Sequence, residues 1–235
     1  MLELKSQTRI DERGNTVFDV TIKTSDGREK KRSLSLSDYI LLLSESKKAT
    51  DEYITLPEGF LPENVIESCV ASVHQYDIIW RVKGKKRCFL YRSISSDEPK
   101  AYTIPFPDLI FRLHVDNDVI RAKECFASKE GDDHLYAYPF GNVSTSGEIC
   151  MGNIQVTGLS QRVDTFTDDF FLGITNNDYW KISERINIKG CDWSQQKLVD
   201  ELTKRETFPS EWLMPCPGQV IGFLKQRQKK ACGLV

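Results

Sequence analysis

Residues 140–151 (FGNVSTSGEICM) place an amide side chain, a turn glycine and a thiol at fixed offsets. Cys150 lies three residues after Gly147 and eight after Asn142. The tract from Ser144 to Gly147 can reverse the chain tightly with Gly147 at positive φ, which would hold Asn142 and Cys150 at a common rim. A thiol can carry an acyl group as a thioester, and a preorganised amide can stabilise the oxyanion of amine attack by about 3 kcal/mol. We therefore interpret Cys150 and Asn142 as a candidate site for thioester chemistry.

Each of these residues also has a structural interpretation. A cysteine between two apolar neighbours, Ile149 and Met151, is most often a core residue. Asn142 could shape its loop as an Asx-turn, which is compatible with a role in the chemistry. No basic residue adjoins Cys150 in sequence, and a carrier charged by transthiolation needs a permanent thiolate less than a protease does. The base that a cysteine hydrolase would use is His134.

The spacing around Cys150 resembles the active-site flap of ubiquitin-conjugating enzymes. The flap pattern of that family is His-Pro-Asn-Ile/Val, three variable residues, Gly, one variable residue, Ile/Val, Cys, Leu. The matching positions are Asn142, Val143, Gly147, Ile149 and Cys150.

A longer resemblance, from about residue 56 to 153, is to the PRTRC system protein B family, a bacterial relative of these enzymes of the prokaryotic ubiquitin-conjugating family D type. The similar blocks, in chain order, are residues 56–57, 61–66, 77–80 and 86–90, then strand segments 104–111 and 119–123 before the flap.

The resemblance implies a conjugating enzyme. Cys150 would accept a ubiquitin-like modifier from an adenylating activating enzyme and pass it to an amine, a lysine of a protein target, with Asn142 stabilising the oxyanion. The chain itself would need no cofactor, because the activating enzyme uses the ATP. The resemblance further implies a companion JAB-type metalloprotease and a role in antiphage defence. The alternatives are a non-catalytic module that binds the modifier or the activating enzyme, and a cysteine hydrolase.

Two departures from the family pattern bear on these expectations. Phe140 and Gly141 replace the His-Pro that precedes the flap asparagine. Residues 155–159 stand where eukaryotic relatives carry the Trp-Ser-Pro loop that docks RING-type ligases, so recognition of such ligases is not implied.

Composition excludes several classes of protein. With 235 residues, 40% hydrophobic and 28% charged, the chain can bury a normal core, and a net charge of −2 favours neither nucleic acid nor anionic lipid as a partner. No apolar run approaches the length of a signal peptide or a membrane span, which predicts a cytoplasmic protein with no membrane partner. Seven cysteines without paired short spacings predict reduced thiols, and the histidines and cysteines show no metal-ligand spacing.

The elements that must position the site form an expected α+β fold, an antiparallel β-meander flanked by helices. Residues 1–51 are predicted as a ββα extension, with a strand at 16–23, a turn at Asp26-Gly27, a return strand before Ser35 and an amphipathic helix from Leu36 to Leu43. Residues 52–235 are predicted as the catalytic domain. Its expected elements are a helix at about 64–73, strands at 76–82, 87–91, 109–115 and 119–125, and helices at 194–205 and 219–230.

Overall fold

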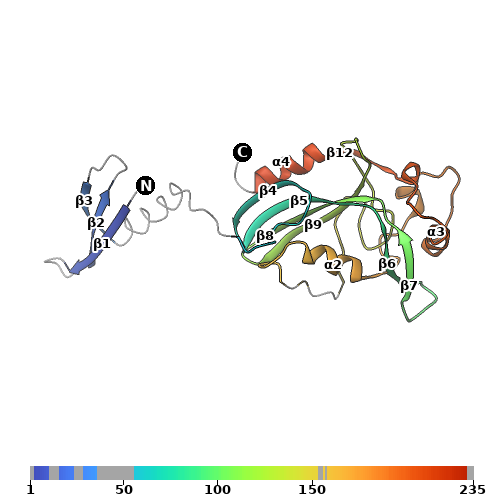
Figure 1. The fold of residues 1–235 in the computed structure, drawn as a ribbon, viewed down its shortest axis with the longest axis horizontal. Helices are drawn as coiled ribbons and strands as arrows, with labels where there is room; N and C mark the ends of the chain where they lie inside the picture. The colour runs from blue at the N-terminus through green and yellow to red at the C-terminus, as the bar shows by residue number, and fades with distance from the viewer. Residues whose placement is uncertain are drawn as a thin grey trace. The chain divides into compact units, whose positions relative to one another are not determined.

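The computed structural model describes residues 3–10, 16–23, 29–35, 56–152, 156 and 158–231. The chain divides into two compact units, Met1–Ile54 and Thr55–Val235, which are described one at a time (Figure 1).

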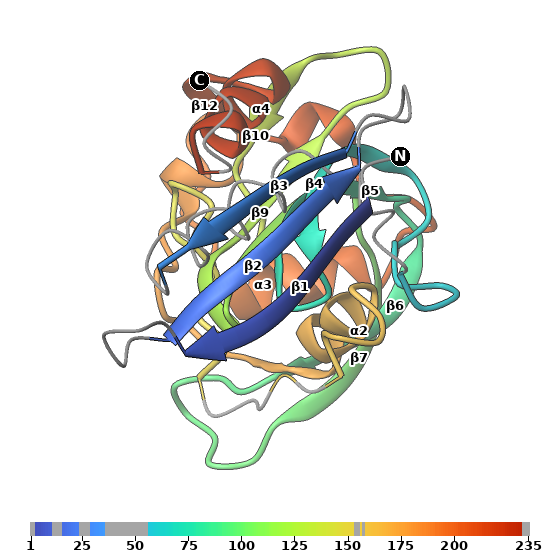
Figure 2. The same ribbon diagram turned by 90° about the vertical axis from the view of Figure 1, so that its left-hand side faces the viewer.

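The first unit contains a three-stranded antiparallel sheet in the order β1-β2-β3 (Figure 2). Its strands are β1 (Glu3–Ile10), β2 (Thr16–Lys23) and β3 (Glu29–Leu34). The last two are the predicted strands, and they pair as the hairpin signal requires, with Lys23 opposite Glu29. β1 was not predicted, because its sequence ELKSQTRI is mostly polar. The predicted Asp26-Gly27 turn and the helix from Leu36 to Leu43 lie outside the described residues.

The second unit is built on a six-stranded sheet in the order β12-β10-β9-β8-β5-β4, with every neighbouring pair antiparallel. The strands are β4 (Val65–Ser72), β5 (Gln75–Val82), β8 (Asp108–Asp116), β9 (Val119–Ser128), β10 (His134–Tyr136) and β12 (Pro215–Val220). Three of them, β5, β8 and β9, are strands of the predicted meander, whereas the strand predicted at residues 87–91 belongs to a separate sheet.

A smaller sheet interrupts the meander between β5 and β8. It has the order β11-β6-β7, with β6 (Lys86–Tyr91) antiparallel to β7 (Lys100–Pro105) and parallel to β11 (Ile174–Thr175). The short strand β11 will matter for the site, because it brings residues 174–179 next to the flap.

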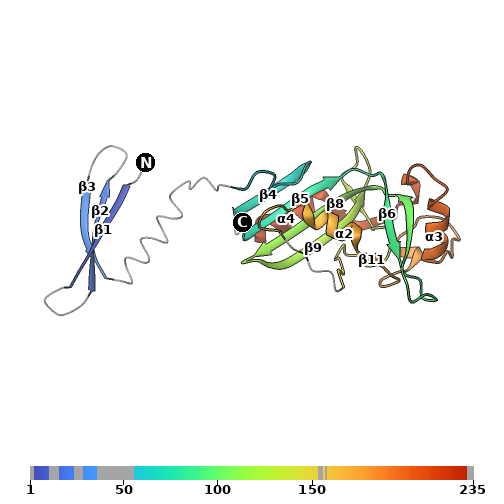
Figure 3. The same ribbon diagram turned by 60° about the horizontal axis from the view of Figure 1, so that its bottom comes forward.

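Helices α2 (Thr165–Leu172) and α4 (Ile221–Ala231) cover opposite faces of the large sheet (Figures 1 and 3). The α2 face buries Trp80, which stacks on Phe111 and meets Phe166 of α2 edge to face. The α4 face buries Ile79 and Leu224. Neighbouring residues of each strand thus point into two separate cores, as strand geometry requires. The third helix, α3 (Gln195–Leu202), packs on β7.

Two of our expectations for this unit were wrong or incomplete. The helix expected at residues 64–73 is strand β4, because the β-branched residues Val65, Ile66 and Val70 pair along β5 in an antiparallel ladder. Helix α2 was not predicted. Within the described part of the chain, no helix has the length and apolar character that crossing a membrane would require.

The expectation that all thiols are reduced is wrong for Cys69 of β4, which is disulfide-bonded. Among the residues that the structure describes, the free cysteines are Cys88, Cys125, Cys150, Cys191 and Cys216.

Candidate active site

The flap, residues 142–150, is a short hairpin that pairs with residues 123–125 of strand β9. The backbone N–H of Cys125 donates to the carbonyl of Gly147 at 2.8 Å, and the N–H of Ile149 donates to the carbonyl of Lys123 at 3.0 Å. Strand β9 therefore fixes the position of the arm that carries Cys150.

The reversal between the two arms is the one that the sequence predicts. The N–H of Ser144 donates to the carbonyl of Glu148 at 2.8 Å, and the N–H of Gly147 donates back to the carbonyl of Ser144 at 3.0 Å. Gly147 has φ +88°, and a Cβ at this position would lie 2.1 Å from the ring of Phe126. Both the backbone conformation and the close approach require glycine.

Asn142 and Cys150 face each other across the hairpin. Val143 and Ile149 form an antiparallel bridge, and the N–H of Cys150 donates to the carbonyl of Asn142 at 2.7 Å. Val143 and Ile149 are buried, and Asn142 and Cys150, one residue beyond this bridge, are both only partly buried. Cys150 is half-buried, and its thiol makes no hydrogen bond to any described residue.

The side-chain amide of Asn142 is bound to the backbone beside β11. Its Nδ2 donates to the carbonyl of Ile174 at 2.9 Å, and its Oδ1 accepts from the N–H of Asn176 at 3.1 Å. The amide thus donates to one backbone carbonyl and accepts from one backbone N–H, the same pair of hydrogen bonds that a neighbouring β-strand would make. It has two N–H donors, so one remains for another acceptor. The loop-shaping role and the oxyanion role are therefore compatible in this geometry.

Phe140 and Gly141, which replace the family's His-Pro, are both tightly packed. Phe140 is fully buried, with its ring centroid 4.7 Å from that of Phe89 and 5.3 Å from that of Phe106. A Cβ on Gly141 would lie 2.1 Å from the carbonyl oxygen of Asn176. The glycine lets residues 176–178 approach the backbone just before Asn142.

Two buried polar side chains hold this arrangement, and neither was identified from the sequence. Gln195 accepts a hydrogen bond from the N–H of Gly141 and donates to the carbonyl of Asn176 at 2.8 Å. Arg185 donates to the carbonyls of Tyr138, Val143 and Tyr179. Gln195 lies at the start of a predicted helix, where a polar residue is ordinary. Arg185 lies in an irregular segment, and no spacing marked it.

His134 lies far from the thiol. It is exposed at the start of β10, with its Nδ1 2.8 Å from a carboxylate oxygen of Asp132. Tyr136 pairs with Ala127 in an antiparallel register, so His134 lies past the C-terminal end of β9. The flap, in contrast, binds β9 at Lys123. The separation is about six residues along β9, roughly 20 Å, so His134 is outside hydrogen-bond reach of Cys150.

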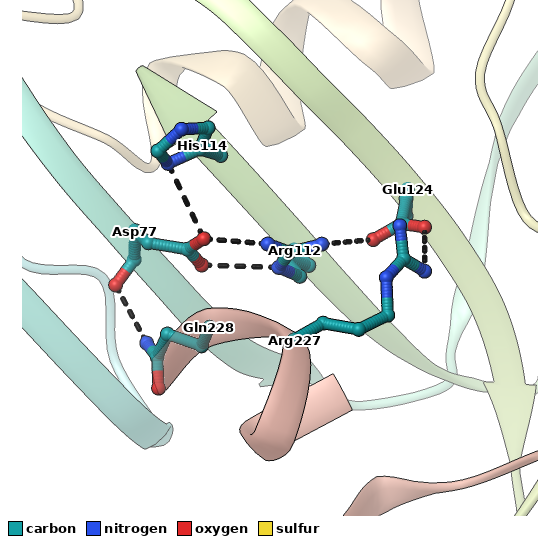
Figure 4. Close-up of polar contacts among 6 residues, drawn as sticks. All are labelled: Asp77, Arg112, His114, Glu124, Arg227 and Gln228. Carbon is teal, nitrogen blue, oxygen red and sulfur yellow. Dashed lines mark hydrogen bonds and ion pairs between the residues drawn. The ribbon is translucent and has the colours of Figure 1, made fainter. Parts of the chain in front are cut away.

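A second buried polar cluster ties α4 to the large sheet (Figure 4). Arg112 donates to both carboxylate oxygens of Asp77, at 3.1 and 2.6 Å, and to Glu124 at 2.9 Å. Arg227 of α4 donates to the other oxygen of Glu124 at 2.5 Å, and Gln228 donates to the Asp77 carbonyl at 2.6 Å. Glu124 also forms a backbone bridge with Glu148 of the flap, a contact that does not involve the side chains of this cluster.

The fold and site define a class of protein. The chain combines an α+β fold, a mostly antiparallel sheet with helices, and a hairpin that sets an asparagine opposite a cysteine. The model of prokaryotic E2 family D matches residues 42–216, well over half of the chain, and the chain belongs to this family. E2 proteins are the ubiquitin-conjugating class, so membership gives the chain a general role in ubiquitin-like conjugation and implies contact with a modifier and an activating enzyme. No curated protein and no solved structure gave a significant match.

Proposed function

We propose that this chain carries a ubiquitin-like modifier as a thioester on Cys150 and transfers it to a lysine of a protein target. The observation that supports this most is the pairing of Cys150 with Asn142 across the flap of an E2-family chain. Two residues that the family pattern specifies are thus joined by a backbone hydrogen bond across one hairpin.

The other free thiols fit this role less well. Burial raises the pKa of the Cys125 thiol well above its usual range and that of Cys216 to about 11. Neither can readily form the thiolate that attacks a thioester. Cys88 is exposed on β6, and Cys191 follows the irregular segment after η1 (Ile182–Glu184). Among the described free cysteines, Cys150 alone has an amide donor opposite it on a hairpin.

The proposed chemistry is two acyl transfers. The Cys150 thiol gives its proton to solvent, its sulfur attacks the thioester that joins the modifier to the activating enzyme, a new S–C bond forms, and the activating enzyme's thiolate leaves. The amine nitrogen of a lysine then attacks the carbonyl, the Cys150 thiolate leaves, and the amine proton passes to solvent. The second N–H of the Asn142 amide would donate to the oxyanion in both steps, a contribution of about 3 kcal/mol for such donors. ATP is used by the activating enzyme, and this chain contributes no cofactor.

Charging tests the proposal. The chain is mixed with ATP, an adenylating activating enzyme and a ubiquitin-like modifier, and adducts are separated with and without reductant. We expect a reductant-sensitive adduct with the wild type and none with Cys150→Ala. An unchanged adduct with Cys150→Ala would overturn the assignment of the thiol. A wild type that never charges, with a partner pair that is active in forming its own adenylate, would favour a non-catalytic binding module.

The hydrolase alternative finds no support in the position of His134. We expect His134→Ala to charge and discharge at rates close to those of the wild type.

We propose that residues 1–51 recruit the activating enzyme, which is supported by the compactness of Met1–Ile54 as a separate unit and by a family match that begins only at residue 42. A companion metalloprotease and a part in antiphage defence remain predictions from the resemblance.

A further inference from the structure

One buried guanidinium holds both ends of the segment that carries Asn142. The Nη1 of Arg185 donates to the carbonyl of Tyr138 at 2.8 Å, and its Nη2 donates to the carbonyl of Val143. Nε and Nη2 donate to the carbonyl of Tyr179, at 3.0 and 2.7 Å. The flap arm from 138 to 143 and the loop at 179 are thereby fixed to one planar group.

Stability alone does not account for this cation. Arg185 is fully buried, and it forms no ion pair with any described residue. Burial lowers the pKa of Arg185 to about 10, which leaves the group charged at neutral pH. A buried charge without a carboxylate partner is costly, and apolar packing commonly serves stability as well or better. The geometry it imposes on the backbone is a better explanation for its presence.

The backbone that Arg185 fixes is in an unfavourable conformation. Tyr179 has φ +60° and Asn142 has φ +63°. Asparagine tolerates this region, but a bulky aromatic residue adopts it only when its surroundings enforce it. The carbonyl of Tyr179 accepts two of the Arg185 hydrogen bonds, and the carbonyl of its neighbour Asp178 accepts the N–H of Asn142 at 2.9 Å. Arg185 therefore holds the loop at residues 178–179 in hydrogen-bonding contact with Asn142.

We propose that Arg185 is a positioning residue, which sets the relative placement of Asn142 and Cys150 by holding the flap arm, residues 138–143, against the loop at Tyr179. The expected effect of Arg185 on transfer of the modifier rests on the proposed function. The expected effect on the accessibility of the Cys150 thiol does not depend on it. Arg185 takes the place of the rigid His-Pro that this flap lacks.

The variant that tests this is Arg185→Lys, because a single ammonium nitrogen keeps the charge but cannot reach three carbonyls in a planar fork. The matched control is Arg112→Lys. Arg112 is also a buried guanidinium, but it binds the carboxylates of Asp77 and Glu124 and does not contact the flap arm. Both variants lose a buried network, and only one loosens the site.

Three thiols of the full chain report the outcome without any partner protein. Iodoacetamide alkylation is followed residue by residue with mass spectrometry. In Arg185→Lys we expect half-buried Cys150 to react about threefold faster or more, exposed Cys88 to keep its rate, and buried Cys125 to stay protected. In Arg112→Lys, Cys150 should keep its rate. Two enzymatic assays complete the test. Discharge of charged Arg185→Lys to free lysine should slow on the order of tenfold. In the charging reaction, the KM of Arg185→Lys with the loaded activating enzyme should equal that of the wild type.

An unchanged Cys150 rate in folded Arg185→Lys, or an equal rise in Arg112→Lys, would overturn the inference. If Cys125 becomes reactive, the variant has unfolded, and Tyr179→Gly replaces it, since glycine frees the loop backbone and leaves the cation in place. Tyr179→Asn is the control for this variant, because asparagine tolerates the same backbone conformation. Alkylation of Cys150 that is faster in Tyr179→Gly than in Tyr179→Asn would then support the proposed role of Arg185, and equal alkylation rates in the two variants would refute it. A chain that shows the alkylation pattern but never charges refutes the proposed function and leaves the proposed role of Arg185 intact.

Discussion

Replacement of Gly147 by alanine should damage the flap more than its small size suggests. Two costs act at this position. The backbone has φ +88°, a conformation that L-residues rarely adopt, and the added Cβ would lie 2.1 Å from Phe126, with two further ring atoms within 2.6 Å. Phe126 is buried in the α4-side core, so its ring cannot move away freely.

The magnitude follows from these two terms. A residue with a Cβ at positive φ costs about 1 kcal/mol, and overpacking a filled core costs typically 1–3 kcal/mol. We expect Gly147→Ala to lower the free energy of unfolding by about 2–4 kcal/mol, unless the flap undocks and leaves the rest intact. Gly131→Ala is the matched control, because Gly131 has φ +75° but a Cβ there would have nothing within 4 Å. It should cost only about 1 kcal/mol.

Urea unfolding, with the slope m compared between variants, measures both numbers. The double variant Gly147→Ala with Phe126→Leu separates the steric term, because a smaller side chain makes room for the methyl group. A double variant more stable than the sum of the single changes would support this account. Equal costs for Gly147→Ala and Gly131→Ala, together with unchanged alkylation of Cys150, would show that the flap does not depend on contact with Phe126.

Three further predictions concern other parts of the chain. Arg112→Met should lower the free energy of unfolding by about 3–5 kcal/mol in urea, because it leaves the buried carboxylate of Asp77 without its arginine and removes one of the two arginines from Glu124, and a loss below about 1 kcal/mol would contradict the network. The Tyr136 hydroxyl, and then the backbone and ring of His134, lower the pKa of Asp132, so the stability they confer is full above about pH 4 and is lost as the pH falls further. Asp132→Asn should therefore flatten the fall in Tm between pH 5 and pH 2, and an unchanged slope would refute the linkage. A chain starting at Glu52 should stay folded by circular dichroism, discharge a preformed thioester normally and charge slowly, whereas an insoluble truncation or full-speed charging would contradict a docking role for the N-terminal unit.

The elements with a clear local signal were predicted from the sequence. Strands β5, β8 and β9 have long β-branched and aromatic runs, and α3 and α4 have amphipathic spacing. Residues 65–72 were assigned to a helix, although this segment lies at the sheet edge and is decided by its pairing with β5. Helix α2 has aromatic residues on several sides, because its neighbours in the core are themselves aromatic.

Only part of the candidate site could be predicted from the sequence. The turn at Gly147 and the opposition of Asn142 to Cys150 depend on spacing within one hairpin, which the sequence displays directly. Arg185 and Gln195 act on the flap from more than 35 residues away, and their partners are backbone carbonyls and an N–H that have no sequence signature. A buried residue that recognises backbone is visible only once the fold has brought the two segments together.

The most direct test of the central claim locates the modifier on the chain. Cys150→Lys and Cys191→Lys change two free, half-buried cysteines in the same way. After incubation with the activating enzyme, modifier and ATP, adducts are treated with reductant and mapped by mass spectrometry. The account predicts a reductant-resistant amide at residue 150 in Cys150→Lys, and a reductant-sensitive adduct still at Cys150 in Cys191→Lys. A reductant-sensitive adduct that persists in Cys150→Lys would contradict the account, because it would place the carrier thiol elsewhere.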